Sequence, residues 1–300
     1  MNSLKFSVVI PCYNASSTIA RTLESLKDQT FKHFEIIVVD DASGDQDVLL
    51  EIIRPYGEYM DITILTNDIN RNGAYSRNRG IEVARAEYIA FLDADDEWVS
   101  TRLESVLSLI EKTEDNQFII YGRFELIRNH YTGALLPIRS IKTGELVSDY
   151  VFAAGQHMQT STFVCPADVA RMILFDVNLI RHQDSDFMMR AQEKGVRFIF
   201  QDIKCASYYF RSDDMRKRIS SGRINSDFCL RWLEIKRHYF SEASIAGYML
   251  SIFSRVIYFE GHKVQSFQMS IHALAKIGWR NIFDLAQTKF FILYKSRLGL

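Results

Sequence analysis

An apolar run that stops abruptly at three carboxylates constrains this chain more than any other feature. Residues 88–92 are Tyr-Ile-Ala-Phe-Leu, and Asp93, Asp95 and Asp96 follow them. A short run rich in aromatic and branched residues is typical of a buried strand. Because open α/β sheets hold their ligands at the carboxyl ends of their strands, this run is expected to deliver its carboxylates to a ligand site.

Two of these acids are spaced for a shared ligand. Side chains two positions apart in an extended segment point the same way, so Asp93 and Asp95 are expected to converge. Burying two like charges is costly, and a divalent cation removes that cost. Carboxylate oxygens suit Mg2+ or Mn2+. A solvated turn with a helix-capping Asp is the alternative, and it would be preferred if the motif stood alone.

Strand and helix signals alternate over the first hundred residues. The four runs that predict strands are residues 6–10, 35–39, 62–65 and 88–92. The amphipathic segments between them predict helices. Such alternation with short connections indicates βαβ units, and therefore an α/β fold with a mostly parallel sheet flanked by helices. Polar residues follow three of these strands, which suggests one shared cleft.

The second half of the chain is less regular. Short strand-like runs and helical segments mix over residues 99–210, as in a mixed α+β addition. The short strands include residues 118–121, 124–127, 197–201 and 206–210. A basic, aromatic-rich stretch then begins, and helical segments follow it. We place a domain boundary near residue 210.

Composition narrows the classes of function. The formal net charge of −1 gives no bias towards nucleic acid. The four cysteines show neither Cys-x-x-Cys spacing nor neighbouring histidines, which argues against a zinc site and fits a reducing compartment. No signal-peptide core and no uncharged run long enough to span a bilayer are seen. We expect a cytoplasmic protein, soluble or peripheral on the inner face of the cell membrane.

Four motifs, in order, resemble a known family. They are residues 7–14, 35–45, 72–80 and 87–96. Together they resemble the inverting glycosyltransferases of family 2, which have the GT-A fold, and further along the chain the likeness is to bacterial surface-polysaccharide transferases of the O-antigen or capsule type. The resemblance implies a GT-A catalytic domain over 1–210, with a nucleotide-binding part (1–98) and an acceptor part (99–210). A helical C-terminal region over 211–300 would follow.

The resemblance implies roles for the acids after the fourth strand. Asp95 would bind the Mn2+ or Mg2+ that bridges the two phosphates of a UDP-sugar. Asp93 would contact the ribose or a metal-bound water. The metal would stabilise the leaving nucleoside diphosphate. Asp96 is expected to cap or to support its neighbours.

The resemblance also implies contacts to the rest of the donor. Pro11 closes the first strand, and Tyr13 would stack on the nucleobase. Asp41 would accept a hydrogen bond from the imide N–H of uracil, while Asp40 is interpreted as structural. Arg77 would face the pyrophosphate. A rim tyrosine, a turn-capping Asp and an exposed helix arginine are the structural alternatives.

Inverting transfer needs a base that deprotonates the attacking hydroxyl. The family places it in a Glu-Asp pair at the start of a late helix. Here Gln183 replaces the Glu and Asp184 stands where the base belongs. Asp186 is the competitor, since acids at helix N-termini commonly cap. Gln159 and Thr160 precede a predicted strand at the same cleft and, by analogy, would contact the acceptor.

The basic, aromatic C-terminal region, 211–300, has two interpretations. It is either a solvated face on helices that complete the fold or a membrane-surface patch, for which Trp232, Tyr239, Phe290 and Phe291 would be suitable. The resemblance implies a polyprenyl-diphosphate-linked glycan acceptor, which favours the second interpretation.

The sequence therefore predicts a metal-dependent, inverting glycosyltransferase. It would move a sugar from a UDP-sugar to a hydroxyl of a lipid-linked glycan in bacterial surface polysaccharide synthesis. A sugar nucleotidyltransferase is one alternative, but no glycine-rich phosphate loop lies near the N-terminus. A non-catalytic nucleotide-sugar-binding protein is the other, and loss of Asp95 or Asp184 would be its mark.

Overall fold

The computed structural model describes residues 4–128, 133–210 and 224–298. Internal contacts divide the chain into two compact units, residues 1–125 with 158–209 and residues 126–157 with 210–300. Each unit is described by itself. Residues 126–157, which the sequence analysis placed in the acceptor part, belong by their contacts to the unit that contains the C-terminal helices.

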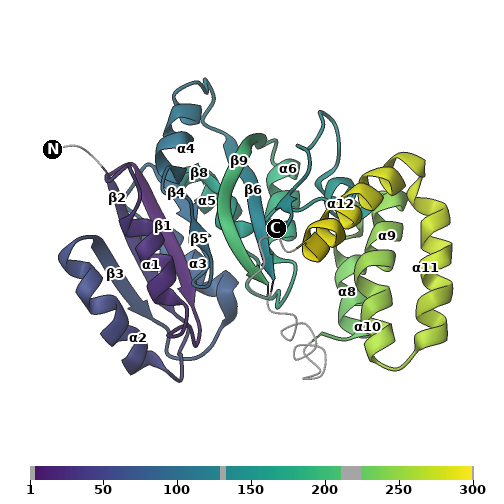
Figure 1. The fold of residues 1–300 in the computed structure, drawn as a ribbon, viewed down its shortest axis with the longest axis horizontal. Coiled ribbons are helices and arrows are strands. Elements are labelled where there is room, and N and C mark those ends of the chain that lie inside the picture. Colours follow the sequence, from purple (N-terminus) through teal and green to yellow (C-terminus); the bar gives the residue numbers. More distant parts are fainter. Residues whose placement is uncertain (1–3, 129–132, 211–223, 299–300) are drawn as a thin grey trace. The chain divides into compact units, whose positions relative to one another are not determined.

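The first unit begins with a parallel sheet. Its strands, in the spatial order β3-β2-β1-β4, are β1 (Phe6–Cys12), β2 (Phe34–Asp40), β3 (Asp61–Thr66) and β4 (Tyr88–Phe91). All three strand pairs within this group are parallel (Figure 1). The predicted strands and their parallel arrangement are therefore confirmed for the first hundred residues.

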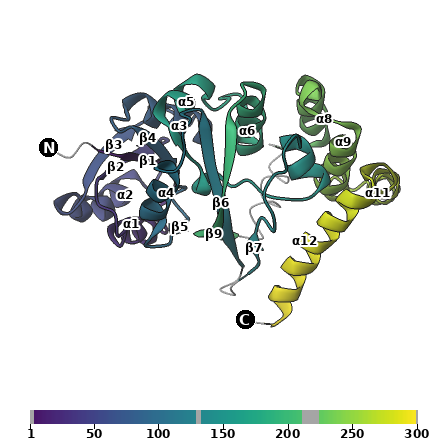
Figure 2. The ribbon, with the colours of Figure 1, turned by 90° about the horizontal axis from the view of Figure 1, so that it is seen from above.

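Helices cover both faces of these strands. They are α1 (Ile19–Lys27), α2 (Gln46–Ile53) and α3 (Asn72–Val83). Figure 2 shows α1 and α2 on one side of the strands and α3 on the other. Covering on both faces explains why β1 and β2 are continuous apolar runs. At Gly80 of α3, an added Cβ would lie 2.4 Å from Cγ1 of Val9, so this approach of helix to strand requires a glycine.

The rest of the first unit adds antiparallel strands. Its elements are β5 (Glu97–Trp98), α4 (Arg102–Ile110), β6 (Phe118–Arg128), β8 (Val164–Pro166), α5 (Ala167–Ile173), α6 (Gln183–Glu193) and β9 (Arg197–Phe210). The sheet continues from β4 in the order β8-β6-β9-β5. The pairs β4–β8, β6–β8 and β5–β9 are antiparallel. The result is one mixed sheet.

Two predicted pairs of short strands are in fact single long strands, β6 and β9. Gly122 lies between the predicted strands 118–121 and 124–127, and a Cβ there would lie 2.3 Å from Sγ of Cys205, so the glycine permits close packing within β6. Asp202 and Lys204 lie between the predicted strands 197–201 and 206–210. Within β9 they form ion pairs with residues of β6, Asp202 with Arg123 and Lys204 with Glu125.

The second unit is mainly helical. Its elements are β7 (Leu135–Leu136), a π-helical turn (Asp149–Ala153), α8 (Ser226–Ile235), α9 (Glu242–Tyr248), a second π-helical turn (Met249–Phe253), α10 (Ser254–Phe259), α11 (Lys263–Ile277) and α12 (Trp279–Leu298). None of the helices in the described part of the chain is long and apolar enough to cross a membrane.

An aromatic cluster forms the core beneath α8 and α9. Phe152 lies 6.0 Å from Trp232 and 5.4 Å from both Phe240 and Tyr248, measured between ring centroids. Trp232 is only 3% exposed. The prediction that Trp232 suits a membrane interface is therefore wrong, because its ring fills this core. Much of the predicted basic stretch, residues 211–223, lies outside the described residues.

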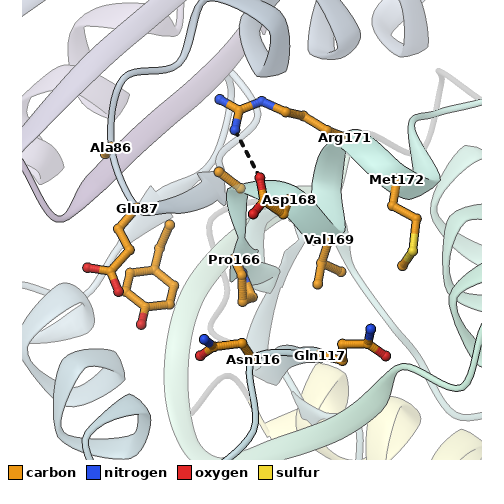
Figure 3. A pocket seen from close by; sticks show the side chains of 11 residues that line it. Ala86, Glu87, Asn116, Gln117, Pro166, Asp168, Val169, Arg171 and Met172 are labelled. Atoms are coloured by element: carbon orange, nitrogen blue, oxygen red, sulfur yellow. Dashed lines mark hydrogen bonds and ion pairs between the residues drawn. The ribbon is translucent and has the colours of Figure 1, made fainter.

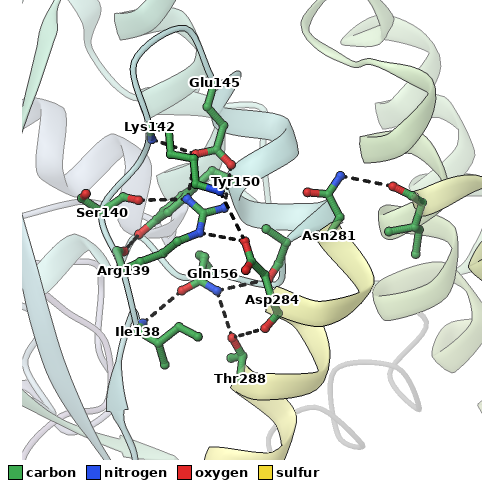
Figure 4. A network of polar contacts seen from close by, with 12 residues as sticks. Ile138, Arg139, Ser140, Lys142, Glu145, Tyr150, Gln156, Asn281, Asp284 and Thr288 are labelled. Carbon is green, nitrogen blue, oxygen red and sulfur yellow. Dashed lines mark hydrogen bonds and ion pairs between the residues drawn. The ribbon is translucent and has the colours of Figure 1, made fainter. Parts of the chain in front are cut away.

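A polar network joins α12 to the segment before the first π-helical turn (Figure 4). Arg139 forms ion pairs with Glu145 at 2.7 Å and with Asp284 of α12 at 2.8 Å. Gln156 accepts from the Ile138 N–H and donates to Oγ1 of Thr288 on α12. These buried, directional contacts determine which face of α12 points inward.

Candidate active site

The parallel strands bring the predicted polar segments to one edge of the sheet. Cys12 lies opposite Asp40 in the β1–β2 register, so the residues after both strands leave the sheet together. The loops are joined there, since the Asn14 N–H donates to Oγ of Ser43 at 2.9 Å and the Gly44 N–H donates to Oδ1 of Asn14 at 2.8 Å. The same edge receives the residues that follow β4, because Val9 of β1 pairs with Phe91.

The acids after β4 form a close cluster around a buried member. Asp96 is fully buried, and its Oδ2 accepts from Ser161 Oγ at 2.5 Å and from Gln159 Nε2 at 3.0 Å. Burial, and after it the charges of Asp93 and Asp95, raise the pKa of Asp96 well above its usual value. Asp96 is therefore hydrogen-bonded to the turn before β8, which fits a supporting role.

The turn before β8 lies against the same cluster. The Asp93 N–H donates to Ser161 Oγ at 3.0 Å, which ties the end of β4 to this turn. Gln159 contacts Asp96, as described above, whereas the side chain of Thr160 is buried. The structure thus brings Gln159 to the acids. An acceptor contact by Gln159 or Thr160 stays a prediction.

Arg77 joins the acids to the start of α6. It is buried, and its guanidinium pairs with Oδ1 of Asp93 at 2.5 Å. Its Nη1 also donates to Oε1 of Gln183 at 3.0 Å. The structural alternative of an exposed helix arginine is therefore wrong for Arg77. A diphosphate contact would have to be made from a guanidinium that already bridges two elements.

Asp184 lies in the electrostatic field of this group. Burial raises the pKa of its carboxyl, as does the charge of Asp93. The Ser185 N–H, which donates to Oδ1 of Asp184 at 2.8 Å, and the charge of Arg77 act in the opposite direction. A carboxyl group that lies near the other acids and has a raised pKa is suited to act as a general base.

Asp186, the competitor for the base, has a structural role. Its side chain is fully buried, and Oδ2 accepts from Nε of Arg190 at 2.7 Å, one helical turn away. Arg190 also donates to the backbone oxygens of Ile173 and Leu174, which anchors α6 to the end of α5. The contacts of Asp186 thus favour Asp184 as the reactive acid of α6.

The two residues predicted to contact the nucleobase differ in exposure, since Tyr13 is exposed and Asp41 is buried. Tyr13 follows β1, after Pro11, and is 52% exposed, so its ring is accessible for stacking. Asp41 is 2% exposed, and its carboxylate accepts from Asn67 Nδ2 at 2.6 Å and from the Asn72 N–H at 2.7 Å. Asp41 therefore holds the loop before α3, and its contact with uracil stays a prediction.

A pocket of about 420 Å³ lies elsewhere in this unit (Figure 3). Its lining includes Glu87 and Tyr88 at the start of β4, Pro166 at the end of β8, and Asp168 and Arg171 of α5. Because β8 runs antiparallel to β4, all of these residues lie at the edge of the sheet opposite the acids. The pocket is therefore not part of the candidate site.

Comparison with known proteins identifies the family. The model for glycosyl transferase family 2 matches residues 7–178, more than half of the chain. The amylovoran biosynthesis glycosyltransferase AmsB of Erwinia amylovora is 36% identical over 256 residues, which is 83% of each chain. This chain belongs to glycosyl transferase family 2. The nucleotidyltransferase alternative is thereby disfavoured, and glycosyl transfer is the activity of the chain.

Two further relatives of this family 2 enzyme are informative. The Escherichia coli protein WfgD, named a UDP-Glc:alpha-D-GlcNAc-diphosphoundecaprenol beta-1,3-glucosyltransferase, is 34% identical over 132 residues, 43% of this chain and 49% of WfgD. The crystal structure of S. aureus TarS 1–349 with UDP-GlcNAc covers 91% of this chain and 80% of its own, with a TM-score of 0.64 and 21% identity. The expected GT-A fold with a helical C-terminal region is confirmed.

The carboxylates of this family 2 site fit a divalent metal ion that is held partly by the protein and partly by the phosphates of a substrate. Among the described residues, no three His, Cys, Asp or Glu side chains are grouped to hold a metal by themselves. Mg2+ and related ions are, however, commonly held by one or two carboxylates together with substrate phosphates. Asp93 and Asp95 can supply such carboxylates, and Arg77 is already ion-paired with Asp93.

Tyr208 and Arg21 are site residues that the sequence analysis did not single out. Burial, followed by the charges of Asp96, Asp95, Asp93 and Asp184, raises the pKa of the Tyr208 phenol, so its hydroxyl shares their surroundings. Arg21 donates through Nη2 to the Asp95 backbone oxygen at 2.6 Å and fixes that turn. Nothing in the sequence distinguishes either one from an ordinary strand tyrosine or helix arginine.

Proposed function

We propose that this glycosyltransferase moves a sugar from a UDP-sugar to a hydroxyl of a lipid-linked glycan, in one displacement that inverts the anomeric carbon. The observation that carries the proposal is the linkage through Arg77. This residue pairs with Asp93 on the donor side and hydrogen-bonds Gln183, the neighbour of Asp184, on the other. This linkage supports the assignment of the donor acids and the expected base to one site.

In the proposed reaction, Asp184 accepts the proton of the attacking hydroxyl. As that oxygen forms a bond to C1 of the sugar, the bond from C1 to the diphosphate oxygen breaks on the opposite side, and UDP leaves. Asp96, which is buried and accepts from Ser161 Oγ, orients the turn that presents Asp93 and Asp95. A bound Mn2+ or Mg2+ would neutralise the charge that develops on the diphosphate.

Tyr13 is positioned for the nucleobase. Its exposed ring, next to the joined loops after β1 and β2, offers a flat surface on which uracil can stack. Asp41 would contribute by keeping the loop before α3 in place, and through that loop the start of the helix that carries Arg77.

The relatives support the choice of substrates. WfgD is named for transfer from UDP-Glc to a GlcNAc joined to diphosphoundecaprenol, with a β linkage, and AmsB is named for polysaccharide biosynthesis. We therefore propose a polyprenyl-diphosphate-linked acceptor in surface polysaccharide synthesis, with the reaction at the cytoplasmic face of the membrane.

The test is product detection with a panel of UDP-sugars and a polyprenyl-diphosphate-linked sugar as acceptor. We expect a glycosylated lipid product with the opposite anomeric configuration to the donor, assigned by NMR. Activity should disappear in EDTA and return with Mn2+ or Mg2+. A product that retains the donor configuration would refute the single displacement. Full activity in EDTA would refute the requirement for a metal ion.

A further inference from the structure

The outward face of α11 carries an apolar stripe. Val264, Phe267, Ile271 and Leu274 recur three or four residues apart, so they lie on one side of the helix. They are 70%, 68%, 55% and 41% exposed. The opposite side is buried through Ala273 and Ile277, which belong to a core cluster of this unit. Helix α11 is thus apolar on both faces, and the described residues of the unit cover only one of them.

The following helix repeats this arrangement. Trp279, Phe283 and Phe290 of α12 are separated by four and seven residues, which again places them on one side. They are 75%, 59% and 66% exposed. The inward face carries Leu285 and Thr288, both buried. We call these seven exposed residues of the two helices the outer stripe.

The two helices that carry the outer stripe are rich in basic residues. Residues 263–298 contain six Lys or Arg residues and one acid, Asp284. That acid is ion-paired with Arg139 inside the unit. Lys263, Lys276 and Arg280 are exposed on the same two helices. A partner for this surface must therefore accept aromatic side chains and carry negative charge.

We propose that the outer stripe docks on an anionic lipid surface. Helices that lie in a membrane interface combine Trp, Phe and Leu on one side with Lys and Arg beside them, and their binding strengthens with anionic lipid. A second copy of this chain fits less well, because a two-fold contact would bring the same cations close to one another.

Docking on lipid and sugar transfer would depend on different parts of the chain. Lipid docking would add a binding partner to the proposed function, whose acceptor is lipid-linked, and it would depend on helices α11 and α12 alone. It can therefore be measured without donor, acceptor or metal. A failure to bind vesicles would leave the proposed transfer standing, and a failure of transfer would leave the docking surface standing.

The experiment is co-sedimentation of the full chain with vesicles of phosphatidylcholine alone or mixed with phosphatidylglycerol. We expect binding to the mixed vesicles, much weaker binding to phosphatidylcholine, and loss of binding at high salt because screening weakens the attraction. The paired variants F267E/I271E on α11 and W279E/F283E on α12 should each reduce the partition coefficient by roughly tenfold or more.

The matched control is Tyr59→Glu in the first unit. Tyr59 is 74% exposed and Trp279 is 75% exposed, so this substitution adds a negative charge at a similarly exposed aromatic residue, one charge where each paired variant adds two. We expect it to bind vesicles as the unaltered chain does. Thermal unfolding of every variant checks that the exposed substitutions leave the fold intact.

Three results would overturn the proposal. The first is that the unaltered chain ignores vesicles containing phosphatidylglycerol. The second is that both paired variants bind as well as Tyr59→Glu. The third is that the paired variants change the sedimentation coefficient of the protein without vesicles, which would show that the outer stripe joins copies of this chain.

Discussion

Replacing Gln183 with Glu tests the electrostatic link between α6 and the acidic cluster. Gln183 accepts from Arg77 Nη1 at 3.0 Å, and its Nε2 donates to the Leu179 oxygen at 2.6 Å and to Asn72 Oδ1 at 3.3 Å. A glutamate would still accept from Arg77. It would also place a second negative charge next to Asp184 and neutralise the guanidinium that now lowers the pKa of Asp184.

Both effects raise the pKa of Asp184 further. Like charges at short range move a carboxyl pKa by roughly 1–3 units. Side chains adjacent in a helix do not face each other, so we expect the lower end, about one unit or about 1.4 kcal/mol. A base acts in its deprotonated form, so kcat/KM falls as the pH drops through its pKa. The acidic limb of the profile should therefore move to higher pH by about one unit.

The assay is kcat/KM for the UDP-sugar across the acid and neutral range. At a pH on the acidic limb, Gln183→Glu should be about tenfold less active than the unaltered enzyme. Above the limb, the charge effect should vanish, because Asp184 is deprotonated in both proteins.

Gln183→Ala is the matched control. It removes the hydrogen bond to Arg77 but adds no charge, so the acidic limb should stay in place. The KM for the donor should rise instead, by roughly fivefold for a lost hydrogen bond of about 1 kcal/mol. If the profile of Gln183→Glu coincides with that of the unaltered enzyme, or if Gln183→Ala moves the limb as far, the electrostatic reasoning is wrong.

Three further predictions concern metal binding and stability. Asp95→Asn should remove the Mn2+-dependent part of the thermal stabilisation by UDP, since ligand that binds only the folded state raises Tm; an undiminished shift would exclude Asp95 as a ligand. Gly80→Ala should lower the free energy of unfolding by about 1–3 kcal/mol in urea titrations, because the added methyl group overpacks against Val9. Gly57→Ala is the control, since no atom lies within 4 Å of its added Cβ, and it should be neutral or slightly stabilising. Arg102→Leu should cost about 1–3 kcal/mol, since it leaves the buried Thr162 oxygen, now bonded at 2.6 Å, without its donor; an unchanged urea midpoint would contradict this.

The nucleotide-binding half was predictable because three of its four strands, β1, β2 and β4, are almost entirely buried. Each such strand is a continuous apolar run, and the polar residues after it can only meet at the carboxyl edge. The convergence of the segments after Cys12, Asp40 and Phe91 follows from that rule. The strands of the antiparallel half were harder to predict from the sequence. Gly122 and the charged residues of β9 are of types common at strand ends, but here they pack inside long strands.

The site was predictable in its acids but not in the contacts between them. Motif spacing indicated Asp93, Asp95 and Asp184. It could not show that Arg77 joins the first of these to Gln183, because that contact spans 106 positions and depends on how α3 and α6 pack. Nor could it show that Asp41 is engaged by its own loop. Such long-range contacts depend on packing and leave no periodic pattern.

In the C-terminal region, residue type alone was misleading. Trp232 and the exposed Trp279 are equally aromatic and lie in similarly basic surroundings, yet one fills a core and the other is 75% exposed. Only the packing of α8 against Phe152 and Tyr248 separates the two cases.

The most direct test of the account is the turnover of Asp184→Asn with its UDP-sugar donor and lipid-linked acceptor. The amide can still accept from the Ser185 N–H, so the start of α6 should be preserved. We predict a loss of about 100- to 10,000-fold in kcat, typical of removing a general base, with donor binding by calorimetry nearly unchanged. Asp168→Asn, at an exposed acid of α5, should be fully active. Near-normal turnover by Asp184→Asn would contradict the account.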